Sequence, residues 1–159
     1  MVLTTDKKMN TNWHKLSFTE LSAKQIYDIL QLRAEVFVVE QQQPYLDVDN
    51  RDLVCGHVLG YQGDTLTAYC RVFPKGSYFD DGCVGRVVVK PSARGTGLGH
   101  NLLLKGIELH NEMNGESTSI TISAQLRLRN FYEEHGFIKT STCYQDDNIP
   151  HIHMTRSTE

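Results

Sequence analysis

The sequence predicts a single α/β domain built on a mixed sheet with helices on both faces. Its 159 residues fit one globular domain. Helical and strand patterns follow one another in the order α, β, β, β, α, β, α, β, β, which is typical of helices layered on a sheet. The continuous β-branched run Val87–Val89 indicates a central strand that is covered on both faces. Residues 1–15 are polar and lack periodicity, so we expect a loose N-terminal lead before a domain over residues 16–157.

The first helix is predicted to begin after Ser22, which forms a capping box with Gln25. Its apolar residues follow one helical stripe, and Arg33 is the polar exception on that stripe. A charged side chain in that position needs a partner. We favour a structural pair with Glu40 or with an aspartate of the following loop over the alternative that Arg33 binds a substrate carboxylate.

A long polar loop over residues 40–52 separates this helix from the strands that follow. Its acidic residues either form a solvated surface or present negative charge to a cationic substrate. Strands are predicted over residues 57–61 and 65–73, joined by the hairpin link 62–64, and a third strand over residues 83–90.

The second half of the chain continues the same layered pattern. Gly115 and Gly136 each follow a helical stripe and are predicted to end it. The predicted elements are a helix over residues 98–114, a strand over 117–124, a short helix over 126–135 and closing strands over 137–144 and 151–156.

Composition excludes several classes of function. The 16 Lys and Arg residues against 19 Asp and Glu residues give a net charge of −3, which argues against nucleic acid or an anionic membrane as a partner. The longest apolar run, Val36–Val39, is far shorter than the roughly 20 residues that a membrane span needs. No apolar signal segment is visible at the start of the sequence, so we expect a cytoplasmic protein.

The four cysteines are predicted to be reduced thiols, mostly buried in strands. None of them forms a C-x-x-C pair, so neither a zinc site nor a thioredoxin-like site is supported, and we expect no metal. The four are Cys55, Cys70, Cys83 and Cys143.

A glycine-rich loop leads from the valine strand directly into the second long helix. Backbone N–H groups at such a junction, together with the helix dipole, form a phosphate site. Gly95, Gly97 and Gly99 do not have the G-x-G-x-x-G spacing of a dinucleotide site, and no Lys-Ser or Lys-Thr follows them as in a Walker loop. NAD and P-loop nucleotides are therefore disfavoured, and the plain alternative is a turn that only closes a strand–helix unit.

These segments resemble the GNAT family of N-acetyltransferases. The family signature [RQ]-x-x-G-x-[GA] is matched by residues 94–99, and residues 84–89 resemble the fourth strand of the family. Residues 130–137 resemble its C-terminal motif. Residues 32–41 and 149–154 resemble the ElaA-like bacterial branch. The resemblance implies a mixed, mostly antiparallel sheet that splays between its fourth and fifth strands.

The resemblance also implies where acetyl-CoA binds. The main chains of Val87, Val88 and Val89 are expected to hold the pantetheine arm. Gln125 stands where relatives have an asparagine that contacts this arm, and Asn130 lies in the C-terminal motif. The pyrophosphate is expected on the backbone amides of Arg94, Gly95, Thr96, Gly97, Leu98 and Gly99.

The implied reaction is direct attack of an amine on the thioester, without an acyl-enzyme and without a metal. Tyr132 matches the tyrosine that protonates the departing CoA thiolate. The attacking amine must lose a proton, and the oxyanion needs a backbone N–H, for which Val88 and Val89 are the candidates. Residues 83–90 contain no carboxylate, so Glu40 and His151 are the candidates for the general base.

The predicted function is therefore acetyl transfer from acetyl-CoA to an amine of a small molecule or a peptide, by a monomer or homodimer. The alternative from another class is a non-catalytic module that binds or senses acyl-CoA. A nucleotide-binding domain is a third possibility, which predicts affinity for ATP or NAD.

Overall fold

The structure, a computed structural model, describes residues 9–158 and contains two four-stranded groups of strands. In the first group the spatial order is β1-β2-β3-β4, and all neighbours are antiparallel. In the second, β8 lies between β5 and β6, and β7 pairs with another part of β8. The first group comprises β1 (Asn12–Ser17), β2 (Gly56–Gln62), β3 (Thr65–Phe73) and β4 (Cys83–Val89); the second comprises β5 (Ile120–Gln125), β6 (Ile138–Lys139), β7 (Tyr144–Asp146) and β8 (Ile149–Arg156).

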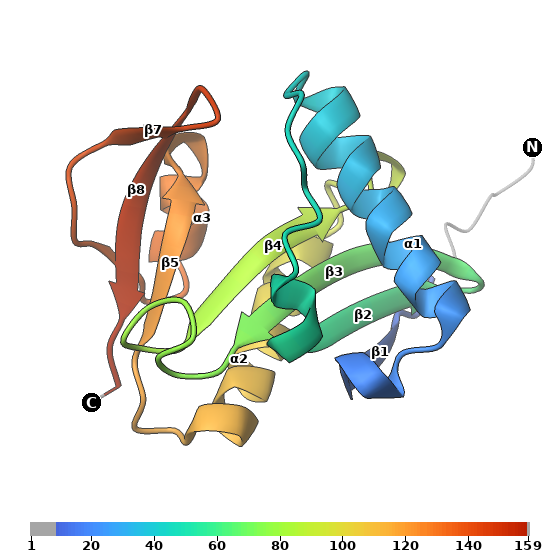
Figure 1. Ribbon diagram of the computed structural model, residues 1–159, viewed down its shortest axis with the longest axis horizontal. Coiled ribbons are helices and arrows are strands. Elements are labelled where there is room, and N and C mark those ends of the chain that lie inside the picture. The colour runs from blue at the N-terminus through green and yellow to red at the C-terminus, as the bar shows by residue number, and fades with distance from the viewer. Residues whose placement is uncertain (1–8, 159) are drawn as a thin grey trace, which may run out of the picture.

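The two groups touch at one end and then diverge, which confirms the predicted splay between the fourth and fifth strands. Gly82 forms a parallel bridge with Ile120, and its carbonyl accepts from the Thr121 N–H at 2.9 Å. Beyond this bridge, β4 and β5 share no further strand pairing within residues 9–158. The ribbon shows the two strands running apart from this common end (Figure 1).

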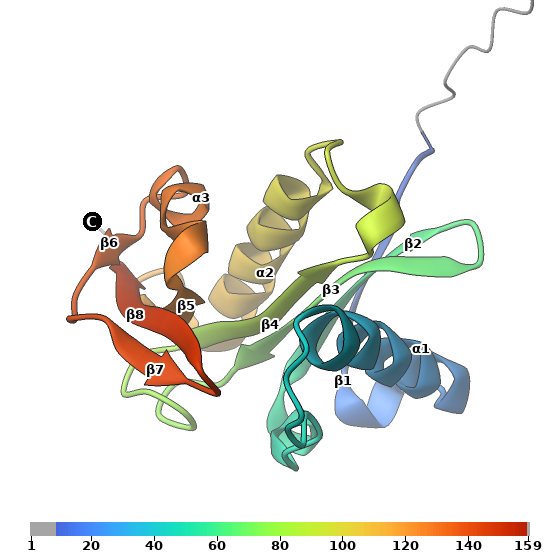
Figure 2. The same ribbon diagram turned by 90° about the horizontal axis from the view of Figure 1, so that it is seen from above.

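Helices cover both faces of the sheet, as predicted. Helix α1 (Ala23–Arg33) packs against β3 and β4 on one face, and α2 (Leu98–Asn114) packs against β2, β3 and β4 on the other. Figure 2 shows these two helices on opposite sides of the strands, with α3 (Arg129–Glu133) on the same side as α2. Short 3₁₀ turns cover Phe18–Glu20, Arg51–Val54, Pro91–Ala93 and Leu126–Leu128.

The sequence signals at the helix ends are confirmed. Ser22 accepts the Gln25 N–H at 3.1 Å, and the Gln25 side chain accepts the Ser22 N–H at 2.9 Å, which completes the capping box. Helix α1 then continues as a wider π-helical turn over Ala34–Glu40. Helix α2 has the predicted bounds and ends at Gly115, whose φ of +87° is accessible to glycine at little cost.

The strand alternation of β4 separates two apolar cores. Val88 packs into the cluster under α1 with Ile29, Leu32 and Tyr69. Val87 and Val89 pack against the larger cluster under α2. The valine run is therefore a strand with apolar contacts on both faces, as the sequence predicted.

The prediction of a loose N-terminal lead over residues 1–15 is wrong for residues 12–15. They belong to β1, which pairs with β2 from Asn12↔Tyr61 to Ser17↔Gly56. This edge strand has few apolar contacts, so its sequence lacks the alternation that marks a half-buried strand. The glycine at position 60 of β2 allows β1 to pack closely, because a Cβ there would lie only 2.7 Å from the Trp13 ring. Residues 1–8 of the predicted lead lie outside the described residues.

The predicted closing strand over residues 137–144 is also wrong in part, since β6 and β7 replace it. The Thr140 N–H donates to the His153 carbonyl at 2.9 Å, but the His153 N–H donates to the Ser141 hydroxyl at 2.8 Å. A side-chain acceptor thus takes the place of a backbone carbonyl, and the ladder is interrupted there.

Candidate active site

The space between the diverging strands is a cavity of about 750 Å³. Its walls combine β4 and β5 with the loop that follows the π-helical turn, the start of α2 and the short helix α3. A ligand in it would touch both strand groups at once. Residues 85–89, which include the predicted pantetheine-binding valines, form one side of the cavity.

Strand β4 contains a β-bulge beside this cavity. Between the pairs Tyr69↔Val88 and Arg71↔Gly85, one residue of β3 opposes two residues of β4, Arg86 and Val87. Arg86 adopts a φ of +49°, which is uncommon for a residue with a side chain. The bulge interrupts the ladder at the middle of the cavity wall.

The direction of the β4 backbone groups follows from one hydrogen bond. The Lys90 N–H donates to the Thr67 carbonyl at 2.8 Å and so faces β3. The direction of the N–H groups alternates along a strand. The N–H of Val88, which pairs with Tyr69, therefore also points toward β3. Val89 directs its N–H to the open side, where β4 has no neighbouring strand. Of the two predicted oxyanion donors, Val89 is therefore the one whose N–H does not point toward β3.

The glycine loop forms an open cradle at one end of the cavity. Gly95 and Gly97 both have a φ of +80°, and a Cβ on either would meet nothing within 4 Å. Helix α2 begins directly after Gly97, and Asn101 is the first residue there whose N–H bonds to a carbonyl of the turn before it, at 3.3 Å. The N–H groups of Leu98 and Gly99 thus remain available for an anion, as the phosphate-site prediction requires.

Two predicted cofactor-binding residues lie outside the cavity wall. The hydroxyl of Thr96 donates to the Ala93 carbonyl at 3.0 Å within its own loop. Asn130 is exposed on α3, two residues before Tyr132 and so on a different side of that helix. Gln125 does line the cavity, where its amide bonds to Arg127 at 2.9 Å and to Gln41 at 3.3 Å.

Tyr132 lies in the cavity wall and is otherwise buried, with 7% of its surface exposed. Burial raises the pKa of Tyr132 above its ordinary value, and the neighbouring Cys70 and Cys83 act in the same direction. The phenol therefore stays protonated at neutral pH, which is the form that can donate a proton. No hydrogen-bond partner engages its hydroxyl in the described part of the chain.

The prediction of Glu40 as a general base is not supported by its surroundings. Both carboxylate oxygens accept from the Arg94 guanidinium, at 2.7 and 2.8 Å, and Glu40 does not line the cavity. The hydrogen bond from Arg94 lowers the pKa of Glu40 below its ordinary value. A carboxylate held in this way is a poor proton acceptor.

His151, the other candidate base, lines the cavity opposite the bulge. It pairs with Gln125 of β5 and with Tyr144 of β7. Its Nδ1 lies 2.7 Å from the Ile149 carbonyl, an acceptor only, so Nδ1 carries the hydrogen. The Nε2 lone pair is then free to accept a proton.

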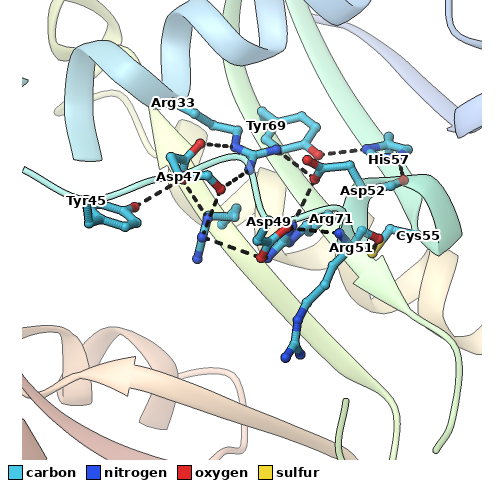
Figure 3. Close-up of polar contacts among 11 residues, drawn as sticks. Arg33, Tyr45, Asp47, Asp49, Arg51, Asp52, Cys55, His57, Tyr69 and Arg71 are labelled. Carbon is cyan, nitrogen blue, oxygen red and sulfur yellow. Dashed lines mark hydrogen bonds and ion pairs between the residues drawn. The ribbon is translucent and has the colours of Figure 1, made fainter. Parts of the chain in front are cut away.

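Arg33 is fully buried and is paired with the loop, as the structural interpretation predicted. Its Nε donates to Asp47 and one terminal nitrogen donates to Asp52, both at 2.7 Å. Glu40, the other predicted partner, is not part of this contact. Figure 3 shows Arg33 inserted between these two aspartates.

The same aspartates bind two more arginines and close a cluster beside the cavity. Arg71 donates to Asp49 at 2.7 Å and to Asp52 at 2.9 Å, and the bulge residue Arg86 lies 2.8 Å from Asp47. Three guanidinium groups thus balance three carboxylates. The acidic loop therefore offers no net negative charge to a substrate, and with Asp47 and Asp52 buried it is not a solvated surface, so both alternatives from the sequence are wrong. We call Arg33, Arg71, Arg86, Asp47, Asp49 and Asp52 the arginine–aspartate cluster.

Neighbouring groups fix the positions of the cluster. Asp52 accepts through its carbonyl from His57 Nε2 at 2.9 Å, which leaves His57 Nδ1 to accept from the Tyr69 hydroxyl at 2.7 Å. Tyr45 donates to Asp47 at 3.0 Å, and burial raises the pKa of Tyr45 to about 12. All of these contacts are drawn in Figure 3.

Sequence reasoning missed several residues of the cavity wall. One of them is Tyr78, and the Arg51 guanidinium carbon lies over its ring, 4.3 Å from the ring centre. Asp146, the last residue of β7, and Asp147, the next residue, also line the cavity and make no ion pair within residues 9–158. Their signal in the sequence is only that of a polar turn, and the fold alone brings them to the cavity.

Neither a metal group nor a membrane-spanning helix is found among residues 9–158. No set of three or more His, Cys, Asp or Glu side chains in that range is placed to hold a metal ion. None of the helices there is both long and apolar enough to cross a bilayer. Three cysteines are buried, as predicted, while Cys143 is exposed.

Comparisons with known proteins agree with this geometry. The family model described as "Acetyltransferase (GNAT) domain" matches residues 57–158. Protein ElaA of Escherichia coli is 40% identical over 146 residues, which cover 91% of this chain and 95% of ElaA.

Solved structures give the same result. An acyl-CoA N-acyltransferase from Pseudomonas aeruginosa has a TM-score of 0.89 and 37% identity, covering 93% of this chain and 100% of that one. The crystal structure of Escherichia coli ElaA has a TM-score of 0.87 and 38% identity, with the same coverage. The chain therefore belongs to the GNAT family of acyltransferases and is similar to ElaA over nearly its whole length.

Proposed function

We propose that this protein transfers an acetyl group from acetyl-CoA to an amine by direct attack on the thioester. One observation carries the proposal. A single cavity holds, along β4, an open N–H cradle at Gly95–Gly99, a bulged strand edge and the protonated phenol of Tyr132. These are the groups that a phosphate, an extended pantetheine arm and a departing thiolate require.

The residues present fit the cofactor. Gly95 and Gly97 leave room for a pyrophosphate, since a Cβ at either position would meet nothing within 4 Å. The free N–H direction of Val89 suits hydrogen bonding to an extended arm laid along β4. When bound, acetyl-CoA supplies the activated acetyl group, and the protein supplies donors and a proton acceptor.

The chain's own residues then account for each proton. An alkyl ammonium has a pKa of about 10.4, so the amine must lose a proton before it attacks. His151 accepts that proton at Nε2. The amine nitrogen forms a C–N bond with the acetyl carbon, the Val89 N–H stabilises the developing oxyanion, and the C–S bond breaks. Tyr132 donates its proton to the leaving sulfur, and the second proton lost by the amine nitrogen restores the phenol.

The acceptor is proposed to be an amine of a small molecule or peptide. Asp146 and Asp147, which line the cavity without ion-pair partners within residues 9–158, support a cationic acceptor. The cytoplasmic location and the choice between monomer and homodimer stay predictions.

The first test is thermal unfolding with acetyl-CoA, CoA, ATP or NAD, each at about a hundred times the Kd found by titration. Such a ligand adds about 2.7 kcal/mol of stability, or roughly 5 °C for a domain of this size. We expect a shift with acetyl-CoA and CoA only. A shift with ATP or NAD alone, or no shift at all, would overturn the proposal.

The second test separates an enzyme from a binding module. Tyr132→Phe is expected to lower turnover by about 100-fold or more, while acetyl-CoA affinity stays within about threefold. Thiol release with a panel of primary amines measures turnover. Tyr27→Phe, at an exposed position outside the cavity, is the matched control. No acetyl transfer by the unmodified protein to any amine of the panel would favour the non-catalytic acyl-CoA-binding module.

A further inference from the structure

We infer that two neighbouring histidines, His100 and His135, take up a proton when a phosphate group of CoA binds, and so add a cation to the glycine cradle. The inference rests on the proposed function, because it takes CoA as the ligand. It concerns two side chains that the proposed reaction does not use.

The two rings form one unit beside the cradle. His100 is the third residue of α2, directly after Gly99, and it lines the cavity. Its Nδ1 lies 2.8 Å from His135 Nε2, at the end of α3. The Phe131 ring contacts both, with ring centres 4.9 Å from His100 and 5.5 Å from His135.

This contact limits the charge that the pair can carry. At 2.8 Å one nitrogen must donate and the other must accept, so the shared position holds a single proton. The pair is then either neutral or singly protonated, with the additional proton on one of the outer nitrogens. A second charge would break the contact.

Charged groups of both signs lie around the pair. Glu134 Oε2 lies 3.8 Å from His100 Nε2, and its charge favours the charged form of His135. Arg156 of β8, which donates to the His135 carbonyl at 3.1 Å, disfavours it, as does the N-terminus of α2. Burial, followed by the charge of His100, lowers the pKa of His135. A phosphate beside His100 would add the negative charge that shifts this balance toward protonation.

Neither of the two basic side chains that flank the cradle in sequence is free to bind a phosphate. Lys90 is already engaged by Glu35 at 3.0 Å, and Arg94 by Glu40 at 2.7 Å. The backbone N–H groups there supply only partial charges. Protonation of His100 and His135 supplies a full charge, and only while the ligand is present.

The test is isothermal titration calorimetry with CoA at pH 7 in buffers of different ionisation enthalpy, which counts the protons exchanged per CoA bound. We expect the unmodified protein to take up about half a proton more than His135→Gln or His100→Gln. Glutamine keeps a hydrogen-bonding amide but does not titrate. His14→Gln, at an exposed position of β1 away from the cavity, is the control and should match the unmodified protein.

Affinity gives a second readout with a definite sign. Because the bound state holds more protons, CoA affinity should increase as the pH falls from 8 to 6. The ratio of the CoA affinity at pH 6 to that at pH 8 should be about tenfold larger for the unmodified protein than for His135→Gln. The 3′-phosphate of CoA itself titrates near pH 6, so the same series is run with dephospho-CoA. A histidine-dependent difference that persists there assigns the contact to the pyrophosphate, and one that vanishes assigns it to the 3′-phosphate; both support the inference.

Equal proton counts for the unmodified protein and both glutamine variants would overturn the inference, provided that thermal unfolding shows the variants folded. This result is distinct from failure of the proposed function, in which CoA would not bind the unmodified protein at all. CoA binding without histidine-dependent proton uptake refutes only the role of the pair.

Discussion

Two regions of the cavity wall treat charge in opposite ways. At the cradle, glycines 95 and 97 leave backbone N–H groups open, while the flanking Lys90 and Arg94 are paired with Glu35 and Glu40. Beside the β4 bulge, the arginine–aspartate cluster satisfies its charges internally and is largely removed from solvent. We propose that the first region binds a charged ligand, whereas the second stabilises the fold.

This difference shows which charges in the sequence carry information about ligands. The acidic loop is conspicuous in the sequence, yet its aspartates serve the fold by fixing Arg33, Arg71 and Arg86. Through its contact with Asp47, Arg86 also connects the cluster to the β4 bulge, where Arg86 has a φ of +49°. The cluster should therefore govern stability, and the cradle should govern CoA binding.

The largest expected effect comes from Arg33→Met. It leaves Asp47 and Asp52 buried without their central cation, and we expect the free energy of unfolding to fall by about 3–5 kcal/mol. Urea denaturation measures this loss. Arg129→Met removes a surface pair with Glu133 and should cost less than about 0.5 kcal/mol. A loss below about 1 kcal/mol for Arg33→Met would contradict the structural role of the cluster.

The next effect tests the cradle. Gly97→Glu places a carboxylate where the phosphate is expected, and acetyl-CoA affinity should fall at least about 100-fold, or about 2.7 kcal/mol. Gly115→Glu is a close control, because Gly115 also has a positive φ and open space at its Cβ but lies at the far end of α2. Gly115→Glu is the more strained variant, because Gly115 has a ψ of 148° whereas Gly97 has a ψ of 6° in the left-handed region. Only Gly97→Glu should nevertheless lose binding in a titration. Equal affinities would remove the cradle from the site.

Most of the fold was predictable because its elements are defined by local patterns. The capping box at Ser22, the strand over Thr65–Phe73 and the stop at Gly115 are each found at their predicted places. Edge strand β1 was not predicted, because one edge of the strand is exposed to solvent and its side chains make few apolar contacts. The break between β6 and β7 depends on the Ser141 hydroxyl, a contact over 12 residues that no local pattern reports.

The candidate site divides in the same way. The cradle and Tyr132 lie in contiguous motifs, so the family resemblance located them. The choice between Glu40 and His151 required the fold, because it depends on Arg94 reaching Glu40 from 54 residues away. Asp146 and Asp147 were not identified, because only the pairing of β7 with β8 brings that turn to the cavity.

The smallest expected effect concerns the rim of the cluster and its dependence on pH. Asp49 is partly exposed; burial acts to raise its pKa, but hydrogen bonds and attraction from Arg71 outweigh this and hold the pKa below its ordinary value. Its contribution to stability is thus present above the unfolded-state pKa of about 3.9 and is lost as the pH falls below it. At pH 7 we expect Asp49→Asn to be less stable by about 1 kcal/mol, a figure reduced for solvent screening.

The pH series gives this prediction its sharpest form. The stability gap between the unmodified protein and Asp49→Asn should close as the pH falls from 5 toward 2, as followed by urea denaturation at each pH. Asp64→Asn, in the exposed β2–β3 hairpin and without an ion pair among residues 9–158, is the control and should show no such gap. A gap that stays constant down to pH 2 would mean that Asp49 acts through packing rather than charge. The cluster would then owe its charge-dependent stability to the ion pairs that do not involve Asp49.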